Sequence, residues 1–255
     1  MHGDGRSRLQ IGGGVAVGVV AKVIKDMSHP NVRTERKAAL EYRTGCPLCG
    51  KSNPEIFMPR LAPLPPDHTP ELKPHFDFFL TTLGFAPNSV LTMQRKPKLV
   101  KAFAQLNAAV MDPEGEVDLG FRRLIGHLAS KAAGCLYCQA HTVLGAKNFG
   151  VDDARLEALW DFRTSLLYTA KERVALEFAL AAAAQPNAVT DDLFAELARH
   201  WSEAQIVEIL GVVAMFGFLN RWNDSMATPL EPVPQALAER ILGTHGWSAG
   251  KHDRD

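Results

Sequence analysis

The stretch Gly134-Cys135-Leu136-Tyr137-Cys138-Gln139-Ala140-His141-Thr142 places two thiols three residues apart and a histidine three residues after the second thiol. On an α-helix, steps of three keep side chains on neighbouring positions of one face. The spacing therefore predicts that Cys135 and Cys138 can close a disulfide with little backbone movement and that His141 can exchange protons with a thiol. Gly134 favours a helix start at Cys135, where the helix dipole favours a thiolate. We interpret the stretch as a redox-active Cys-x-x-Cys (CxxC) dithiol.

Two other interpretations of this pair stay open, namely inert core cysteines and half of a zinc site. A second pair, Cys46 and Cys49, would have to supply the other half of that zinc site. Zinc half-sites are usually roughly 12–20 residues apart, whereas these two pairs are separated by more than 80 residues. The spacing favours the redox dithiol, and we predict neither a metal nor a cofactor.

Composition narrows the function classes. The chain has 255 residues, of which 46% are hydrophobic, enough for a sizeable core. Lys plus Arg and Asp plus Glu both number 28, so no overall charge attracts nucleic acid or an anionic membrane, and we predict neither partner. Four cysteines in so long a chain do not form a disulfide scaffold. We predict a cytoplasmic protein.

Residues 1–57 differ from the rest because they lack sustained periodicity. The apolar run from Ile11 to Val20 is too short to span a bilayer, and no convincing signal-peptide cleavage site follows it. We predict a loosely structured extension over residues 1–57 and a helical domain over residues 58–255. Met58 resembles a natural start, which leaves open whether residues 1–57 belong to the natural protein.

From Met58 onward, apolar residues recur at steps of three and four between helix caps. Asp118 is a predicted N-cap, and Thr169 to Glu172 and Ser202 to Gln205 are predicted capping boxes. No segment has alternating strand character or a hairpin turn. The sequence therefore predicts an all-α fold. The expected helices cover residues 70–83, 89–93, 98–111, 119–133, 135–149, 152–160, 174–184, 190–200, 206–222 and 234–242.

The dithiol stretch within residues 119–150 resembles the alkylhydroperoxidase D (AhpD)-like proteins of the carboxymuconolactone decarboxylase superfamily. Residues 172–179 and 218–223 resemble the peroxidase-related branch of this superfamily, and the resemblance extends over about residues 58–234. It implies a compact, oligomeric all-helical fold with antioxidant, peroxiredoxin-type activity that reduces hydroperoxides. An external dithiol or thioredoxin-like protein would then be the reductant. By this resemblance Cys138 is the attacking thiol and Cys135 the resolving one.

Two positions depart from the family pattern. Arg123 stands where the best-characterised members carry a proton-relaying glutamate, and Thr142 stands where they carry the histidine, with His141 one residue earlier. His127, one turn after Arg123, is a candidate substitute for the glutamate, because an imidazole exchanges protons at neutral pH. Arg123 is a candidate ligand for a thiolate or an anionic substrate. Both residues also have plain structural interpretations, as a carbonyl-bonded histidine and a solvated or subunit-contact arginine.

Polar residues end the otherwise apolar helix predicted over residues 206–222. Asn220 and Asn223 are candidates for the substrate pocket, as is Tyr137 between the cysteines, although the favoured interpretation of the asparagines is a hydrogen-bonded helix end. The helix is apolar on more than one face, which predicts a homo-oligomer.

Two functional hypotheses follow. The first is a dithiol oxidoreductase that reduces hydroperoxides, and the alternative is a catalytically inactive oligomeric scaffold or small-molecule-binding protein of the same superfamily.

Overall fold

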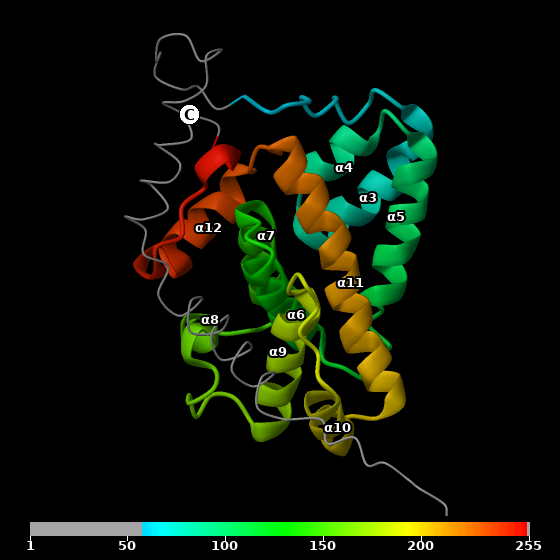
Figure 1. Ribbon diagram of the computed structural model, residues 1–255. Coiled ribbons are helices and arrows are strands. Elements are labelled where there is room, and N and C mark those ends of the chain that lie inside the picture. The colour runs from blue at the N-terminus through cyan, green and yellow to red at the C-terminus, as the bar shows by residue number, and fades with distance from the viewer. Residues whose placement is uncertain (1–57, 254–255) are drawn as a thin grey trace, which may run out of the picture. The chain divides into compact units, whose positions relative to one another are not determined.

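The computed structural model describes residues 58–253, and within this range every regular element is a helix (Figure 1). The prediction of an all-α fold is confirmed. The predicted extension, with Cys46 and Cys49, lies outside the described residues. The helices are η1 (Pro70–Leu72), α3 (Lys73–Leu83), α4 (Asn88–Met93), α5 (Pro97–Val110), α6 (Leu119–Ala132), α7 (Leu136–Asn148), α8 (Asp153–Glu157), η2 (Ala158–Asp161), α9 (Ala170–Ala183), α10 (Asp191–His200), α11 (Glu203–Met226), α12 (Pro232–Leu242), η3 (Gly243–His245) and η4 (Gly250–His252).

Capping residues fix where these helices begin. The Asp118 carboxylate accepts a hydrogen bond from the Phe121 N–H at 2.8 Å, and both predicted capping boxes, at the starts of α9 and α11, are formed. Helix α11 is longer than predicted at both ends. It begins directly after its cap Ser202 and continues to Met226, where Ala227 adopts the left-handed conformation (φ 47°).

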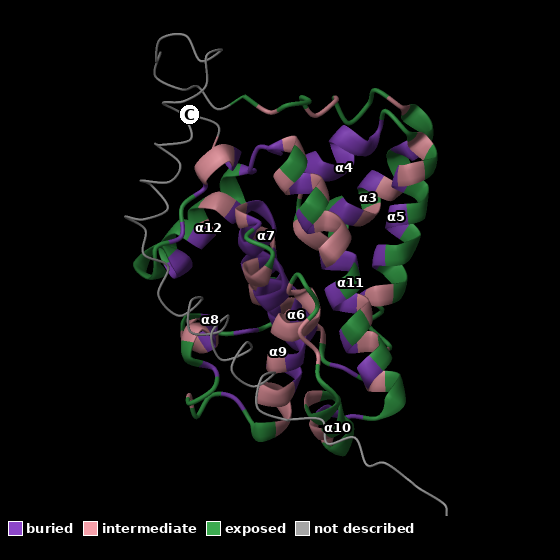
Figure 2. Cartoon of the chain, viewed as in Figure 1, coloured by how far each residue is buried: buried purple, intermediate pink, exposed green. Residues whose placement is uncertain are grey.

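Helices α6 and α7 form the centre of the fold. Helix α6 packs against α7, α9 and α11, and α7 packs also against α11 and α12. Both central helices are buried along most of their length (Figure 2). Gly126 of α6 lies so close to α11 that a methyl group in its place would overlap the Phe216 ring. A small residue there allows the two helices to approach closely.

Helix α11 has one buried and one exposed apolar face. Ile209, Val212 and Phe216 are buried, whereas Val207 and Leu210 are 70% and 45% exposed. In the described part of the chain, α11 is the one helix with the length and hydropathy of a membrane span, but core helices of soluble proteins pass the same test. Its buried face packs against α5, α6, α7 and α9. The absence of a membrane partner stays a prediction.

The C-terminal segment returns to the start of α7. The Leu230 N–H, in the turn between α11 and α12, donates to the His252 carbonyl at 2.8 Å, and η4 packs against α7. The turn after α11 and the C-terminal segment therefore both lie beside the N-terminus of α7.

Candidate active site

The two cysteines lie at the start of α7, as the spacing predicts. Cys135 is the N-cap residue, and Gly134 before it has φ 72°, a left-handed conformation that glycine adopts without strain. Cys138 lies in the first turn. Both side chains are buried free thiols, and their sulfur atoms are within hydrogen-bonding reach of each other. The backbone thus presents the pair on one face, in the reduced form.

Cys138 is a protonated thiol in this environment. Burial raises its pKa well above the ordinary value and the neighbouring Cys135 adds to the rise, while the Asn223 amide acts in the opposite direction. The Asn223 side-chain N–H donates to the Cys138 sulfur at 3.4 Å. Burial thus shifts the Cys138 pKa in the direction opposite to the one that a helix start favours.

The structure separates the two predicted asparagines. Asn223 contacts the Cys138 sulfur, as described above, whereas the side-chain N–H of Asn220, one turn earlier, donates to the Ala129 carbonyl at 3.4 Å. Asn220 thus joins α11 to α6, and Asn223 belongs to the surroundings of the dithiol.

A carboxylate that the sequence analysis missed lies beside His141. Glu231, the N-cap residue of α12, contacts His141 Nε2 through Oε2 at 2.6 Å. Its other oxygen, Oε1, accepts from the Tyr137 hydroxyl at 3.0 Å and from the Asn88 N–H at 2.6 Å. The Tyr137 and His141 rings stack at 4.3 Å between centroids. Three polar groups, two from α7 and one from the start of α4, therefore converge on one buried carboxylate.

This carboxylate is ionised. Burial by itself would raise the Glu231 pKa, but the charge and hydrogen bond of His141, together with the Asn88 N–H, hold the pKa below its ordinary value. The same burial, with the Glu231 charge, raises the Tyr137 pKa well above its ordinary value, so Tyr137 stays a hydroxyl donor. Glu231 and His141 thus form a short hydrogen-bonded pair. A carboxylate in the apolar turn Pro229-Leu230-Glu231-Pro232 was the available sequence signal.

His127 bonds to Thr142 and not to a thiol. The Thr142 hydroxyl donates to the backbone carbonyls of Cys138 and Gln139 at 2.9 and 2.8 Å, so the His127 Nδ1–H donates to Thr142 Oγ1 at 3.0 Å. Burial lowers the His127 pKa to about 4, which leaves the ring neutral at neutral pH. The contacts of His127 are those of a packed core histidine.

Arg123, a residue of α6, packs against the later part of α7 and is not brought to the dithiol. Its guanidinium carbon is 5.6 Å from the centre of the Phe149 ring, and a methyl group on Gly145 would lie 2.9 Å from its Cδ atom. Burial lowers its pKa to about 10. The structure thus places Arg123 beside the C-terminal half of α7, two turns beyond Cys138.

A second polar cluster flanks Cys135. Its sulfur, a carboxylate oxygen of Asp224 and a ring nitrogen of His252 lie within 4.8 Å of one another. Asp224 follows Asn223 on α11, and His252 ends η4. Each thiol therefore has a side chain of α11 next to it, Asn223 beside Cys138 and Asp224 beside Cys135. Among the described residues, the cluster of Cys135, Asp224 and His252 is the group with donor atoms suited to a metal ion.

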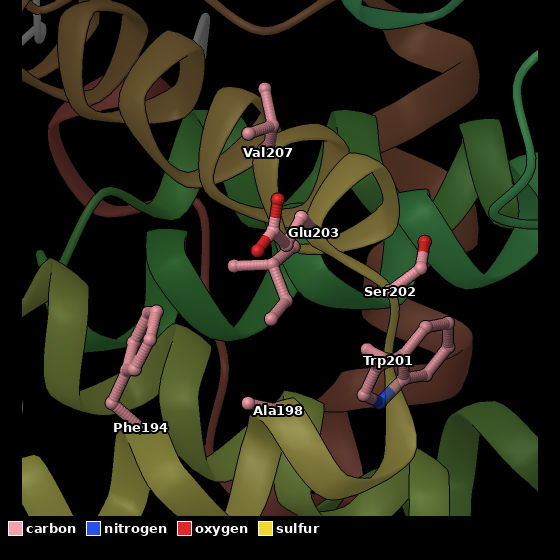
Figure 3. A pocket seen from close by; sticks show the side chains of 7 residues that line it. Phe194, Ala198, Trp201, Ser202, Glu203 and Val207 are labelled. Carbon is pink, nitrogen blue, oxygen red and sulfur yellow. The ribbon is translucent and has the colours of Figure 1, made fainter.

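A separate hollow of about 520 Å³ lies between α10 and the start of α11 (Figure 3). Apolar side chains line most of it, including Phe194, Trp201 and Val207. It contains none of the residues of the dithiol site.

Comparisons with known proteins place this geometry in a family. The Carboxymuconolactone decarboxylase family pattern matches residues 97–181, which include the dithiol. The uncharacterized protein YnjA of Escherichia coli (strain K12) is 31% identical over 111 residues, which are 43% of this chain and 60% of YnjA. The match thus spans less than two thirds of that relative.

Solved structures cover more of the chain. The debrominase Bmp8 is 35% identical with a TM-score of 0.67, over 74% of this chain and 98% of Bmp8. A cysteine-to-alanine variant of Bmp8, in complex with 2,3,4-tribromopyrrole, aligns at 34% identity and the same TM-score, over 75% of this chain and 100% of that one. An AhpD-core peroxidase-related protein of Ralstonia eutropha JMP134 shares the fold at 21% identity and a TM-score of 0.60, over 68% of this chain and 94% of that one. The chain belongs to the carboxymuconolactone decarboxylase/AhpD-like superfamily.

Proposed function

We propose that this protein is a cysteine-dithiol oxidoreductase that transfers two electrons from Cys135 and Cys138 to a small electrophilic substrate. The observation that carries the proposal is the buried thiol pair at the start of α7 within one turn of the His141–Glu231 pair. A dithiol supplies two electrons when it closes to a disulfide, and an adjacent acid–base pair supplies the accompanying proton.

A brominated aromatic ring is the substrate class that we favour. The support is the 35% identity with the debrominase Bmp8 over nearly all of that protein, together with the bound tribromopyrrole in its cysteine variant. Bromine on an aromatic ring is a target for sulfur, and an apolar ring suits a buried site in which the attacking thiol is protonated.

The electrons and atoms balance as follows. The Cys138 thiol passes its proton to the His141–Glu231 pair as its sulfur attacks bromine, the carbon–bromine electron pair stays on carbon, and carbon takes a proton from that pair. The Cys135 sulfur then displaces bromide from Cys138 and loses its own proton. One carbon–bromine bond and two thiols thus become a carbon–hydrogen bond, one disulfide, bromide and a proton. An external dithiol or thioredoxin-like protein reduces the disulfide by exchange.

Hydroperoxide reduction is the second candidate, because the same thiol pair can perform it. Cys138 would attack the O–O bond and release an alcohol, and Cys135 would close the disulfide on the resulting sulfenic acid with loss of water. Glu231, acting through His141, is a carboxylate that compensates for Arg123 at the usual glutamate position. The raised pKa of Cys138 opposes this reaction and the debromination alike, since in both the sulfur attacks as a thiolate.

The test is a single-turnover reaction. Pre-reduced protein is mixed without free thiol with 2,3,4-tribromopyrrole or, separately, with cumene hydroperoxide. Bromide, alcohol and remaining thiols are counted, and mass spectrometry examines the tryptic peptide 132–147, which contains both cysteines. We expect one bromide per two thiols lost, with a Cys135–Cys138 bridge in that peptide.

The variants separate the alternatives. Cys138→Ser should release no bromide, Cys135→Ser should form no bridge in peptide 132–147, and His141→Gln should slow turnover by about 10²–10⁴-fold. His200→Gln, a partly buried histidine paired with Glu196, is the matched control and should leave the rate unchanged. Turnover of the hydroperoxide but not of the bromopyrrole would favour the peroxidase. Equal inactivity of wild type and Cys138→Ser toward both would favour the inactive scaffold.

A further inference from the structure

Cys135, Asp224 and His252 meet from three distant segments, the N-terminus of α7, the last turn of α11 and η4. Cys135 and His252 are fully buried, and the Asp224 side chain is 42% exposed. Their sulfur, oxygen and nitrogen atoms lie within 4.8 Å of one another. Tetrahedral zinc ligands, at 2.0–2.3 Å from the ion, are about 3.3–3.8 Å apart, so side-chain rotations of about 1 Å would close the cluster around one ion.

The tautomer of His252 is set by its surroundings. Its Nδ1 lies 2.7 Å from the Thr228 carbonyl, which can only accept, so Nδ1 carries the proton. The Nε2 atom is therefore unprotonated and presents a lone pair. It is buried, has no hydrogen-bond partner and lies 3.9 Å from Asp224 Oδ1. Metal-binding histidines commonly have this arrangement, in which one ring nitrogen donates to a backbone carbonyl and the other faces the ion.

The remaining donors complete a set. Cys138 lies within hydrogen-bonding reach of Cys135 and can supply a second sulfur. Lys251 Nζ contacts the same Asp224 Oδ1 that lies nearest His252, at 2.7 Å, and a carboxylate oxygen has a second lone pair for an ion. Two sulfurs, one imidazole and one carboxylate match the preferences of Zn²⁺, whereas Mg²⁺ and Ca²⁺ prefer oxygen ligands.

We propose that the reduced dithiol, together with Asp224 and His252, forms a binding site for a thiophilic divalent cation of the Zn²⁺ class. Binding releases the protons of the ligating thiols, and the same sulfur lone pairs would form the disulfide. The ion and the disulfide therefore exclude each other. The site would let the cation protect the thiols from oxidation and block their turnover, whichever substrate they reduce.

The experiment is a Co²⁺ titration of the reduced full-length protein without oxygen. All samples carry Cys46→Ser and Cys49→Ser, because that second pair is itself a potential zinc half-site. We expect one Co²⁺ per chain, with thiolate-to-cobalt absorption in the near ultraviolet and the visible bands of tetrahedral cobalt. Zn²⁺ should abolish these bands, and prior oxidation to the disulfide should prevent them.

Variants at each ligand decide the outcome. Cys135→Ser should remove the near-ultraviolet band or weaken binding at least tenfold, and His252→Gln and Asp224→Asn should each weaken binding at least tenfold. His200→Gln, a histidine of α10 paired with Glu196 and outside the dithiol site, should bind as wild type does. Asp224 is partly exposed, so Asp224→Asn keeps the test valid even if His252→Gln fails to fold. Unchanged affinity in Asp224→Asn, or no tetrahedral cobalt in wild type, would overturn the site. This readout involves no turnover, so it stands or falls separately from the proposed function.

Discussion

Removing the charge of Glu231 tests the acid–base pair most directly. Three donors converge on this buried carboxylate, the Asn88 N–H, the Tyr137 hydroxyl and His141 Nε2. In Glu231→Gln the remaining carbonyl oxygen can still accept from Asn88 and Tyr137, whereas the amide group faces His141. One charge-assisted hydrogen bond is lost, which costs about 1.5–3 kcal/mol of unfolding free energy. Glu231→Ala leaves all three donors unpaired and should cost about 3–5 kcal/mol.

The stabilisation that ionised Glu231 provides should decrease as the pH falls. The folded-state pKa of Glu231 lies below its ordinary value, so its charge contributes stability above the unfolded pKa of about 4.3, and this contribution is lost as the pH falls through the folded pKa. At low pH wild type carries a neutral carboxyl that resembles the glutamine. The stability gap between wild type and Glu231→Gln should therefore be widest at neutral pH and should narrow in acid.

Urea unfolding followed by circular dichroism measures this gap at pH 7 and at pH 4. Glu239→Gln, an exposed glutamate on α12 that contacts Gln235, is the control and should change the unfolding free energy by less than about 0.5 kcal/mol. Turnover in Glu231→Gln should fall about as far as in His141→Gln. A gap below about 0.5 kcal/mol for Glu231→Gln at pH 7 would refute the ionised, hydrogen-bonded carboxylate.

Three further predictions concern the core, the exposed face and the chain start. The folded pKa of His127 is about 4 and the unfolded pKa is 6.5, so the unfolding free energy should fall by about 3 kcal/mol as the pH drops between these values. In urea unfolding at pH 7 and pH 5, His127→Gln should show a smaller fall than wild type. An equal fall in the variant would contradict the buried, neutral histidine. The exposed apolar face of α11 should form a subunit contact, so light scattering should find a homo-oligomer. The double variant Val207→Glu, Leu210→Glu should dissociate this oligomer, and a monomeric wild type would contradict the prediction. Because residues 58–253 contain their own core, a chain that begins at Met58 should melt within about 2 °C of the full chain, and a larger loss would show that residues 1–57 contribute to stability.

Local signals predicted the helices well because each helix end depends on nearby residues. Asp118, Thr169 and Ser202 cap α6, α9 and α11 through bonds that reach three residues along the chain. The placement of Cys135 at a helix start also follows from one local feature, the glycine before it. The left-handed Ala227, which ends α11, had no such signal, and there the predicted helix stopped too early.

The partners of the thiols were harder to predict because they come from distant segments. Glu231 is 90 residues from His141, and Asp224 and His252 reach Cys135 through the turn after α11 and the C-terminal return of the chain. The hydrophobic periodicity of a single helix contains no information about a contact between segments so far apart in the chain. The position of Arg123, in contrast, could have been predicted from the sequence. Helices α6 and α7 form a hairpin about Gly134, so residues equally far from the turn meet, and Arg123 lies as far from it as Gly145 does.

The close contact between Gly126 and Phe216 couples the position of α11 to the size of residue 126. Phe216, which rests on Gly126, lies seven residues before Asn223 on α11, or about two helix turns along the same face. A larger side chain at position 126 would push the Phe216 ring and its helix outward, and the rigid helix would carry that displacement to the amide that touches the Cys138 sulfur. A larger residue at position 126 is therefore expected to change the distance between the Asn223 amide and the Cys138 sulfur, and with it the reactivity of the dithiol.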